Sequence, residues 1–217
     1  ITAVELDSRA VDTGALFVAL RGEQTDGHRY IASAMANGGA GCLVEDDPGE
    51  YIPGKFYIQV PSTLEAVGHV AKAYKEKFDI PVIGVTGSVG KTTTKDMIAA
   101  VLGRKFRVLK TEGNFNNELG LPLTLFRLTP KDEICVLEMG MSALGEIDYL
   151  TRIVVPHVAV ITNIGDAHIE NLGSRENILK AKSEIFNYMS ADGLAVLSGD
   201  DAMLRHDEAH AHQCRGS

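Results

Sequence analysis

Residues 86–94 are Thr86-Gly87-Ser88-Val89-Gly90-Lys91-Thr92-Thr93-Thr94, and they separate an apolar run at 80–85 from a helical pattern that ends at Leu102. Glycines allow such a loop to curl so that several backbone N–H groups point at one anion, and the N-terminus of the next helix adds partial positive charge. A strand, a glycine loop and a helix in this order predict a phosphate-binding loop. The alternative is a glycine-rich turn without a ligand, which would leave Lys91 and Thr92 without an evident structural role.

The residue types in this loop indicate its chemistry. Lys91 would reach the terminal phosphates of a nucleotide, and the Thr92 hydroxyl would hold Mg²⁺. The loop starts one residue tighter than the general phosphate-loop pattern, because Val85 stands where that pattern has a glycine. The residues expected to bind the nucleotide are Gly87, Ser88, Val89, Gly90, Lys91, Thr92 and Thr93.

Composition limits the class of protein. The chain has 217 residues, 45% of them hydrophobic, and a formal net charge of −8. This length predicts one large or two modest domains, and the negative charge argues against a general nucleic-acid surface. No apolar run approaches the roughly 18 residues of a membrane span. Three widely spaced cysteines, without a visible signal peptide, favour the reducing cytoplasm, with Cys42 and Cys135 in the core.

Two α/β parts are expected, with a boundary after residue 79. In the first part, Ser62 and Glu65 have the spacing of a capping box, which predicts that a helix begins there. The expected strands of this part are 1–6, 16–20, 42–45 and 56–60, and its expected helices are 30–37 and 62–78.

The second part, 80–217, alternates strand and helix patterns, which is typical of a mostly parallel sheet covered by helices. Its expected strands are 82–85, 107–109, 134–138, 158–162 and 194–198, and its expected helices are 91–102, 119–125, 146–152 and 175–189. Ligands bind such sheets beyond the carboxyl ends of the strands.

Polar residues follow two of these strands. Glu138 ends an apolar run, so it would lie near the phosphate loop, where a carboxylate can bind Mg²⁺. An ordinary solvated charge at a strand end is the alternative. Asp166 and His168 follow the strand at 158–162. His168 could ligate a second metal or orient a phosphate, or it could have only a structural role.

Lys182 lies on the apolar stripe of its predicted helix, four residues after Ile178 and three before Ile185. Such a lysine either extends its amine to solvent or is desolvated, which lowers its pKa. Spacing alone favours the first arrangement. A neutral amine can add CO₂ and become a metal-binding carbamate. Off the stripe, Lys180 would pair with Glu184 on the helix surface.

Two other polar groups are candidate ligand sites. The loop at 114–118 contains several asparagines that could recognise a polar substrate, although helix capping by an asparagine is the alternative. His206, His210 and His212 have a metal-like spacing. Because no other type of ligand is fixed nearby and these histidines lie in a ragged terminal stretch, metal binding is not expected there.

Together these motifs resemble the Mur ligases, the ATP-dependent amide-forming enzymes of peptidoglycan precursor synthesis. The stretch 84–94 is similar to their nucleotide loop, including its tight start. The other similar stretches are 113–122, 138–142, 163–169 and 180–186, and, in the N-terminal part, 7–9, 14–22 and 26–28. The resemblance covers nearly the whole chain. It implies an α/β fold with a small UDP-binding domain at 1–79 and an incomplete, mostly parallel-sheet, P-loop ATP-binding domain at 80–217.

The resemblance also implies a reaction. ATP would phosphorylate the terminal carboxylate of a UDP-N-acetylmuramoyl tripeptide, and the amine of D-alanyl-D-alanine would then displace phosphate. Lys91 and two Mg²⁺ ions would bridge the carboxylate and the triphosphate, which repel each other. The implied catalytic residues are Lys91, His168 and Lys182. The implied metal ligands are Thr92, Glu138, His168 and Lys182, the last as a carbamate. The implied substrate-binding residues are Ser8, Arg9, Asn114, Asn116, Asn117 and Ser142.

Two other functions stay open from the sequence. One is a ligase of the same superfamily that uses a different amine or acts on folate, although the UDP-like N-terminal part disfavours folate. The other is a nucleotide-binding switch or assembly module without ligase activity, which would need one metal site rather than two. The C-terminal domain of the family has no counterpart in the sequence. We therefore expect this chain to be a folded, cytoplasmic monomer that does not complete ligation alone.

Overall fold

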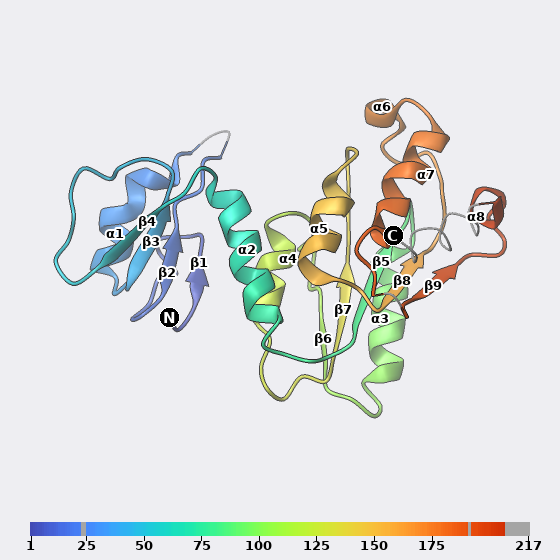
Figure 1. Ribbon diagram of the computed structural model, residues 1–217, viewed down its shortest axis with the longest axis horizontal. Helices are drawn as coiled ribbons and strands as arrows, with labels where there is room; N and C mark the ends of the chain where they lie inside the picture. Colours follow the sequence, from blue (N-terminus) through green and yellow to red (C-terminus); the bar gives the residue numbers. More distant parts are fainter. Residues whose placement is uncertain (23–24, 191, 207–217) are drawn as a thin grey trace. The chain divides into compact units, whose positions relative to one another are not determined.

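The computed structural model describes residues 1–22, 25–190 and 192–206, which belong to two compact units, 1–71 and 72–217 (Figure 1). The division falls inside helix α2 (Thr63–Lys75), rather than at the expected boundary after residue 79. His210, His212 and Cys214 lie outside the described residues, so the expectation about the histidines is not tested.

Unit 1 is built on a four-stranded parallel sheet in the order β1-β2-β3-β4. Its strands are β1 (Val4–Glu5), β2 (Leu16–Val18), β3 (Gly41–Val44) and β4 (Phe56–Gln59). Helix α1 (Ile31–Ala36) buries Ile31, Ala34 and Met35 in a core that also holds Phe17 and Cys42. One of the two hydrogen bonds of the predicted capping box is present: the Glu65 N–H donates to Ser62 Oγ at 3.2 Å.

Unit 2 contains a five-stranded parallel sheet in the order β6-β7-β5-β8-β9. The strands are β5 (Val82–Thr86), β6 (Val108–Lys110), β7 (Ile134–Glu138), β8 (Val158–Ile161) and β9 (Leu194–Leu197). The strand order reverses at the central strand β5, since β6 and β7 lie on one side of it and β8 and β9 on the other. Open parallel sheets bind ligands at such a point, beyond the carboxyl ends of the strands.

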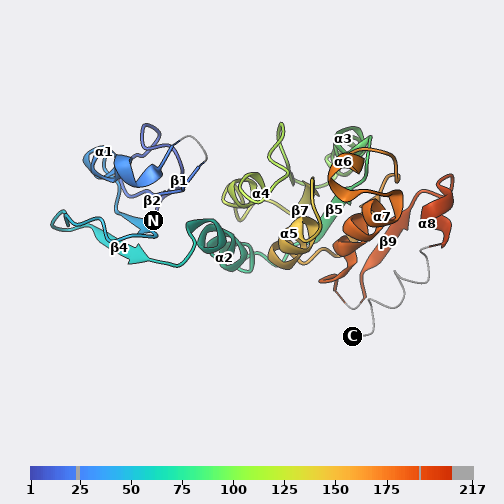
Figure 2. The same ribbon diagram turned by 90° about the horizontal axis from the view of Figure 1, so that it is seen from above.

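Helices cover both faces of this sheet. Figure 2 shows α3 (Lys91–Leu102) on one side and α5 (Glu146–Val154) and α7 (Arg175–Ser183) on the other. Ala99 of α3 packs in a core with Val85, Val136 and Val160. On the opposite face, Gly84 leaves room for a close neighbour, because a Cβ there would lie 3.2 Å from Ile185 Cδ1.

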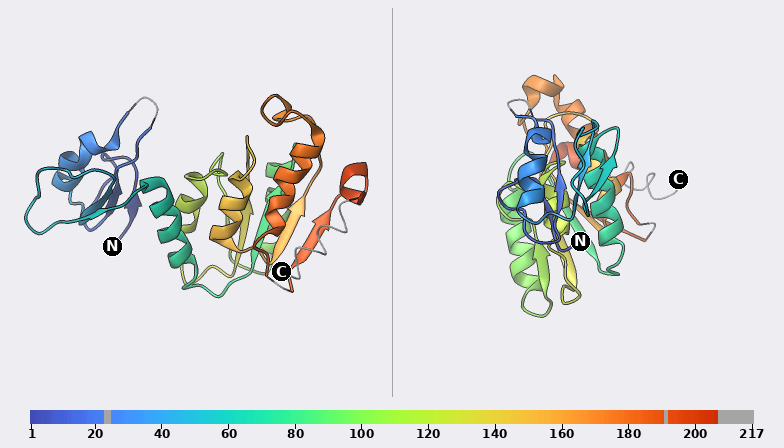
Figure 3. Two further views of the ribbon diagram at one scale, coloured as in Figure 1. Left: turned by 45° about the horizontal axis from the view of Figure 1, so that its top comes forward. Right: turned by 90° about the vertical axis from the view of Figure 1, so that its left-hand side faces the viewer.

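The α/β fold with a parallel sheet is confirmed, and the differences from the predicted elements are local. The helix expected at 175–189 ends at Ser183 and continues as the 3₁₀ helix η2 (Glu184–Phe186). Helix α4 (Gly120–Leu125) was expected, whereas three short helices were not: η1 (Gly27–Tyr30), α6 (Ile169–Leu172) and α8 (Ala202–His206). Helix α6 lies beyond the carboxyl end of β8 (Figures 1 and 3).

The structure also shows the environment of two cysteines and the character of the helices. Cys42 and Cys135 are buried free thiols in strands, as predicted. Within the described ranges, no helix combines the length and the apolar character needed to cross a bilayer.

Candidate functional site

The glycine loop joins β5 to α3 through two positions that need glycine. Gly87 has φ 145°, and a Cβ on it would collide with Thr162 Oγ1. Gly90 is the N-cap of α3 with φ 81°. Because side chains are strongly disfavoured in these conformations, the two glycines fix the shape of the loop.

The first half of the loop is held by Asn163, the second residue after β8. The Ser88 N–H donates to the Asn163 carbonyl at 3.0 Å, and the Val89 N–H donates to Asn163 Oδ1 at 3.1 Å. The Asn163 amide in turn donates to the Val89 carbonyl at 2.9 Å. The Gly165 N–H also donates to Ser88 Oγ at 2.8 Å. These contacts couple the loop to the segment that leads to His168.

The second half of the loop is open to a ligand. In the described part of the chain, the N–H groups of Gly90, Lys91, Thr92 and Thr93 donate to no protein acceptor. Unpaired N–H groups at a helix N-terminus form an anion site. Lys91 is folded back on the loop, because its Nζ donates to the Gly87 carbonyl at 2.9 Å. The local geometry therefore fits the phosphates of a nucleotide.

Glu138 ends β7 next to this loop, since it is registered with Val85 and only 2% of it is exposed. The alternative of a solvated charge is therefore wrong. Its Oε1 accepts a hydrogen bond from Asn116 Nδ2 at 2.9 Å. Its Oε2 is buried and accepts no hydrogen bond from any residue that the structure describes. A buried carboxylate oxygen without a donor is costly unless a cation or water approaches it.

Lys182 is 2% exposed, so its amine does not extend to solvent and the expectation from spacing alone is wrong. Burial, together with the positive charge of Lys91, lowers the pKa of Lys182 to about 8. No hydrogen bond or ion pair reaches the Lys182 amine from the described residues. A larger share of this amine is neutral near pH 7 than for an ordinary lysine, as carbamate formation requires.

The predicted pairing of Lys180 with Glu184 is not observed. Lys180 is exposed, but no ion pair with Glu184 is formed within the described residues. The Glu184 carboxylate instead accepts hydrogen bonds from the N–H groups of Gly145 and Asp148 at 2.8 and 3.1 Å. It therefore caps the N-terminus of α5, a contact that surface spacing could not reveal.

His168 is exposed and adopts the left-handed conformation, with φ 67°. Its ring makes no hydrogen bond or ion pair with any described residue, so it is available to a ligand. Asp166 is not available in the same way, because Arg175 donates two hydrogen bonds to its carboxylate at 2.6 and 2.8 Å. Thr92 is exposed at the start of α3.

The predicted substrate residues of this unit have different surroundings. Asn117 Oδ1 accepts from the Gly120 N–H at 2.8 Å, so the capping alternative holds for this residue. Asn116 orients Glu138, and Asn114 is exposed. The Ser142 hydroxyl donates to Glu146 at 2.9 Å.

Ser8 and Arg9 line a separate pocket in unit 1, with a volume of about 730 Å³. Ser8 is 7% exposed, and the Arg9 guanidinium donates to Asp7 at 2.6 Å. The other lining residues are Leu6, Phe17, Leu20, Gly22, Thr25, Gly27, Tyr30 and Ser33, together with Asp7. Both residues predicted to bind the UDP-linked substrate therefore lie in one cavity.

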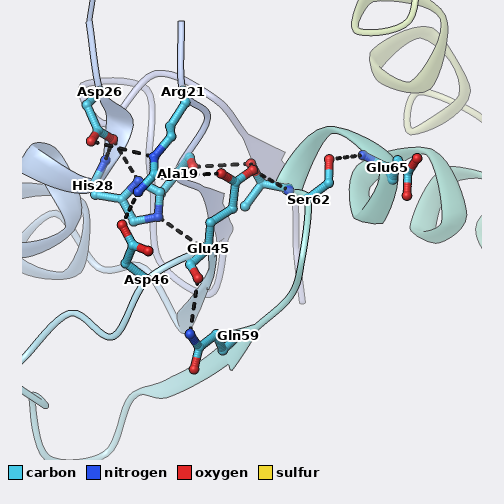
Figure 4. Close-up of polar contacts among 10 residues, drawn as sticks. Ala19, Arg21, Asp26, His28, Glu45, Asp46, Gln59, Ser62 and Glu65 are labelled. Atoms are coloured by element: carbon cyan, nitrogen blue, oxygen red, sulfur yellow. Dashed lines mark hydrogen bonds and ion pairs between the residues drawn. The ribbon is translucent and has the colours of Figure 1, made fainter.

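Unit 1 also contains a polar network centred on Arg21 and His28 (Figure 4). Arg21 forms ion pairs with Asp26, Glu45 and Asp46. The His28 ring bonds Asp26 through Nδ1 at 2.7 Å and accepts the Glu45 N–H through Nε2 at 2.9 Å. Because Nε2 accepts, the proton of a neutral His28 lies on Nδ1. The network ties Arg21 and His28 to the two residues that follow β3, Glu45 and Asp46.

Sequence reasoning missed two residues of the second unit, Lys95 and Thr111. Lys95 is buried on α3 and its Nζ donates to the Thr111 carbonyl at 2.9 Å. A usable signal was present for Lys95, which lies four residues from both Lys91 and Ala99 on the inward face of the helix. Asn163 was recognised only as the start of the polar stretch after β8, and its contacts with the loop were not predicted.

Comparison with known proteins gives consistent matches. Residues 85–215 match the Mur ligase middle domain, and residues 1–75 match a family described as Mur ligase family, catalytic domain. The chain is 47% identical over 215 residues to the UDP-N-acetylmuramoyl-tripeptide–D-alanyl-D-alanine ligase of Bacillus subtilis, covering 99% of this chain and 46% of the relative.

Two solved structures are also similar. MurF from Acinetobacter baumannii has a TM-score of 0.91 and 37% identity, covering 97% of this chain and 46% of that one. MurF ligase from Thermotoga maritima in complex with ADP has a TM-score of 0.89 and 37% identity, covering 96% and 48%. The chain thus spans less than half the length of these relatives.

Proposed function

The chain belongs to the Mur ligase family, and from this membership we propose that it carries the nucleotide- and metal-binding part of a ligase that joins D-alanyl-D-alanine to a UDP-N-acetylmuramoyl tripeptide. The names of its relatives support the two substrates. The ADP complex of the Thermotoga maritima relative supports ATP as the nucleotide.

One observation carries the proposal at the level of chemistry. Four features meet at the carboxyl edge of the sheet: the unpaired N–H groups of the loop, Lys91, the free Oε2 of Glu138, and the desolvated amine of Lys182. A nucleotide switch has no evident use for Lys182, whereas a reaction between two anions needs cations between them, and a carbamate of Lys182 would hold one of these cations.

The donor set fits magnesium. Oxygen ligands suit this ion, and the buried Glu138 Oε2 accepts no hydrogen bond from the described residues. We assign a first ion to Thr92 and Glu138, and a second to His168 and the carbamate of Lys182. When bound, the ions would neutralise the charge of the triphosphate and of the substrate carboxylate.

The residues of the chain have separate tasks in the proposed reaction. The loop N–H groups and Lys91 hold the terminal phosphates while a carboxylate oxygen of the tripeptide bonds to the γ-phosphorus and ADP leaves. The neutral amine of D-alanyl-D-alanine then bonds to the acyl carbon, loses a proton, and phosphate leaves. Lys91 must release the Gly87 carbonyl to reach the phosphates, which is a local side-chain rotation.

The pocket of unit 1 is the proposed site of the UDP part of the substrate. Its volume of about 730 Å³ is within the usual range for small-molecule sites. Ser8 and Arg9 offer a hydroxyl and a cation to that ligand. We also propose that the protein acts in the cytoplasm, where Cys42 and Cys135 would stay reduced.

A phosphate-release assay tests the function. It is run on this chain and on a protein extended to the length of its relatives, with the UDP-linked tripeptide and a panel of amines. The proposal expects release by the extended protein to depend on both the tripeptide and D-alanyl-D-alanine. Release with another amine would indicate a different ligase of the family. ATP binding without any release would favour a nucleotide-binding module.

The phosphate loop is tested separately with Lys91→Ala. Loss of the ammonium should weaken ATP binding by about 100-fold, given the strength of charge-assisted contacts with phosphate. Isothermal calorimetry measures the affinity, and thermal unfolding checks that the variant folds. Unchanged ATP affinity would contradict the assignment of the loop.

A further inference from the structure

Lys95 is a buried cation that the proposed reaction does not use. It lies one turn after Lys91 on α3, but its side chain is only 3% exposed, so it cannot reach a ligand in solvent. Its Nζ donates to the Thr111 carbonyl at 2.9 Å. A buried ammonium is retained where a nearby negative charge compensates for its desolvation.

That negative charge is provided by Glu138. Lys95 Nζ lies 3.8 Å from Glu138 Oε2, and both side chains are 3% exposed. Among the described residues, no other lysine, arginine or histidine forms an ion pair with Glu138. Asp96 lies 3.5 Å from the same Nζ but is 46% exposed and also pairs with Lys110 at 2.7 Å.

Thr111 and Asn116 complete the support of this carboxylate. The Glu138 N–H donates to Thr111 Oγ1 at 3.0 Å, while the carbonyl of Thr111 holds Lys95. Asn116 Nδ2 donates a hydrogen bond to Glu138 Oε1. At 3.8 Å, Lys95 is too far from Oε2 to form a hydrogen bond. These contacts therefore compensate the charge of Glu138 and orient its carboxylate. The lone pairs of Oε2 accept no hydrogen bond from them and can bind a cation.

We propose that Lys95 is a positioning residue that holds Glu138 for the cation accompanying the nucleotide. The inference rests on the proposed function, because it takes Glu138 as a metal ligand. Lys95 contacts neither the nucleotide nor the metal; it acts through the carboxylate. Residues that orient a metal ligand commonly change metal affinity when they are replaced.

The experiment compares ATP binding with and without Mg²⁺ by isothermal calorimetry. Lys95→Met keeps most of the side-chain volume and removes the charge. It should reduce the Mg²⁺-dependent gain in ATP affinity by about tenfold, with ATP affinity in EDTA changed much less. The control is Lys110→Met, which removes the other lysine that pairs with Asp96 and should leave the gain unchanged.

A double-variant cycle separates positioning from a general structural effect. In a Glu138→Gln background, Lys95→Met should cause no further loss of the Mg²⁺-dependent gain, because the residue through which it acts is already altered. Circular dichroism checks the fold. If Lys95→Met does not fold, Lys95→Gln replaces it, since Gln retains a donor for Thr111 without the charge.

The outcomes distinguish the two claims. If Mg²⁺ increases the ATP affinity of the wild type, and Lys95→Met leaves this increase unchanged or enlarges it, the inference about Lys95 is overturned and the proposed function is not affected. An equal loss in both backgrounds would also overturn it and indicate a structural role. If the wild-type protein binds ATP no better with Mg²⁺ than without, the proposed function fails, and this inference fails with it.

Discussion

Lys182 and His168 are held in states that are unfavourable for folding. The ammonium of Lys182 is buried without a partner among the described residues. His168 has a left-handed backbone conformation, which costs a residue with a Cβ about 1–2 kcal/mol. Such states persist where the surrounding structure enforces them, and they cluster at functional sites.

The variant Lys182→Ala tests the proposed role of Lys182, and Lys180→Ala on the same helix is its control. The variant should lose about 100-fold in ligase activity of the protein extended to the length of its relatives, because a metal-binding charge is removed. Lys180→Ala should change activity by no more than about twofold, as for most exposed positions.

Rescue of ligase activity by small carboxylates is a second measurement on the same two variants. Acetate or formate should partly restore activity to Lys182→Ala by occupying the space of the missing carbamate, and should not affect Lys180→Ala. Full activity of Lys182→Ala, or greater damage from Lys180→Ala, would refute the carbamate assignment. Lack of rescue by itself would be weaker evidence, since the anion could bind poorly.

His168→Gly and His168→Ala separate backbone strain from chemistry. Glycine tolerates φ 67°, so the glycine variant should be more stable than the alanine variant by about 1 kcal/mol in urea unfolding. Both variants lack the imidazole and should lose ligase activity to a similar extent. Equal stability of the two would show that the backbone at this position is not strained.

At the scale of secondary-structure elements, the start of α5 depends on a residue from another element. Gly145 is its N-cap and has no side chain to accept hydrogen bonds, and Glu184 of η2 accepts from two N–H groups there. A carboxylate at a helix N-terminus is favourable. This contact also gives a physical reason for the change from α7 to η2 at Ser183, since Glu184 must point toward α5.

The carboxylate of Glu184 predicts a pH dependence of stability. Burial raises the pKa of Glu184 above 4.5, although the two backbone donors oppose this change. The folded protein then binds more protons than the unfolded chain just above pH 4.5, so the contribution of Glu184 to stability falls as the pH rises through that window.

Urea unfolding of the wild type and Glu184→Gln at several pH values between 4 and 7 measures this effect. The stability of the wild type relative to the variant should decrease as the pH rises. A relative stability that increases instead would mean that the hydrogen bonds to Gly145 and Asp148 outweigh desolvation.

On the scale of the whole molecule, each unit has its own candidate ligand site. Unit 1 contains the pocket with Ser8 and Arg9, and unit 2 contains the phosphate loop. The two sites differ in kind, because one is a cavity in a small domain and the other is a row of N–H groups at a helix start. Their ligands should therefore stabilise the two units separately.

Hydrogen exchange can detect this separation. At 100 times its Kd, Mg-ATP should stabilise unit 2 by about 2.7 kcal/mol and slow the exchange of its core amides. UDP should slow exchange in the pocket of unit 1 instead. Lys91→Ala should lose the effect of ATP and keep that of UDP. Protection of both units by either ligand alone would contradict independent sites.

Much of this architecture follows from local sequence patterns. The phosphate loop was predicted because glycine conformation, a lysine and a helix start act within nine consecutive residues. The ranges of α3 and β7 were predicted to the residue for the same reason, since periodicity and turn residues are read over short windows. The identities of the candidate site residues also came from the sequence, and their roles remain predictions.

Long-range packing settled the charge state and partners of those residues. The pairing of Lys95 with Glu138 joins positions 43 residues apart, and it depends on which face of α3 meets which strand. Spacing showed Lys182 on an apolar stripe but could not show whether its amine reaches solvent. The physical reason is that desolvation and ion pairing depend on everything packed around a group. Those neighbours come from distant segments that no local pattern specifies.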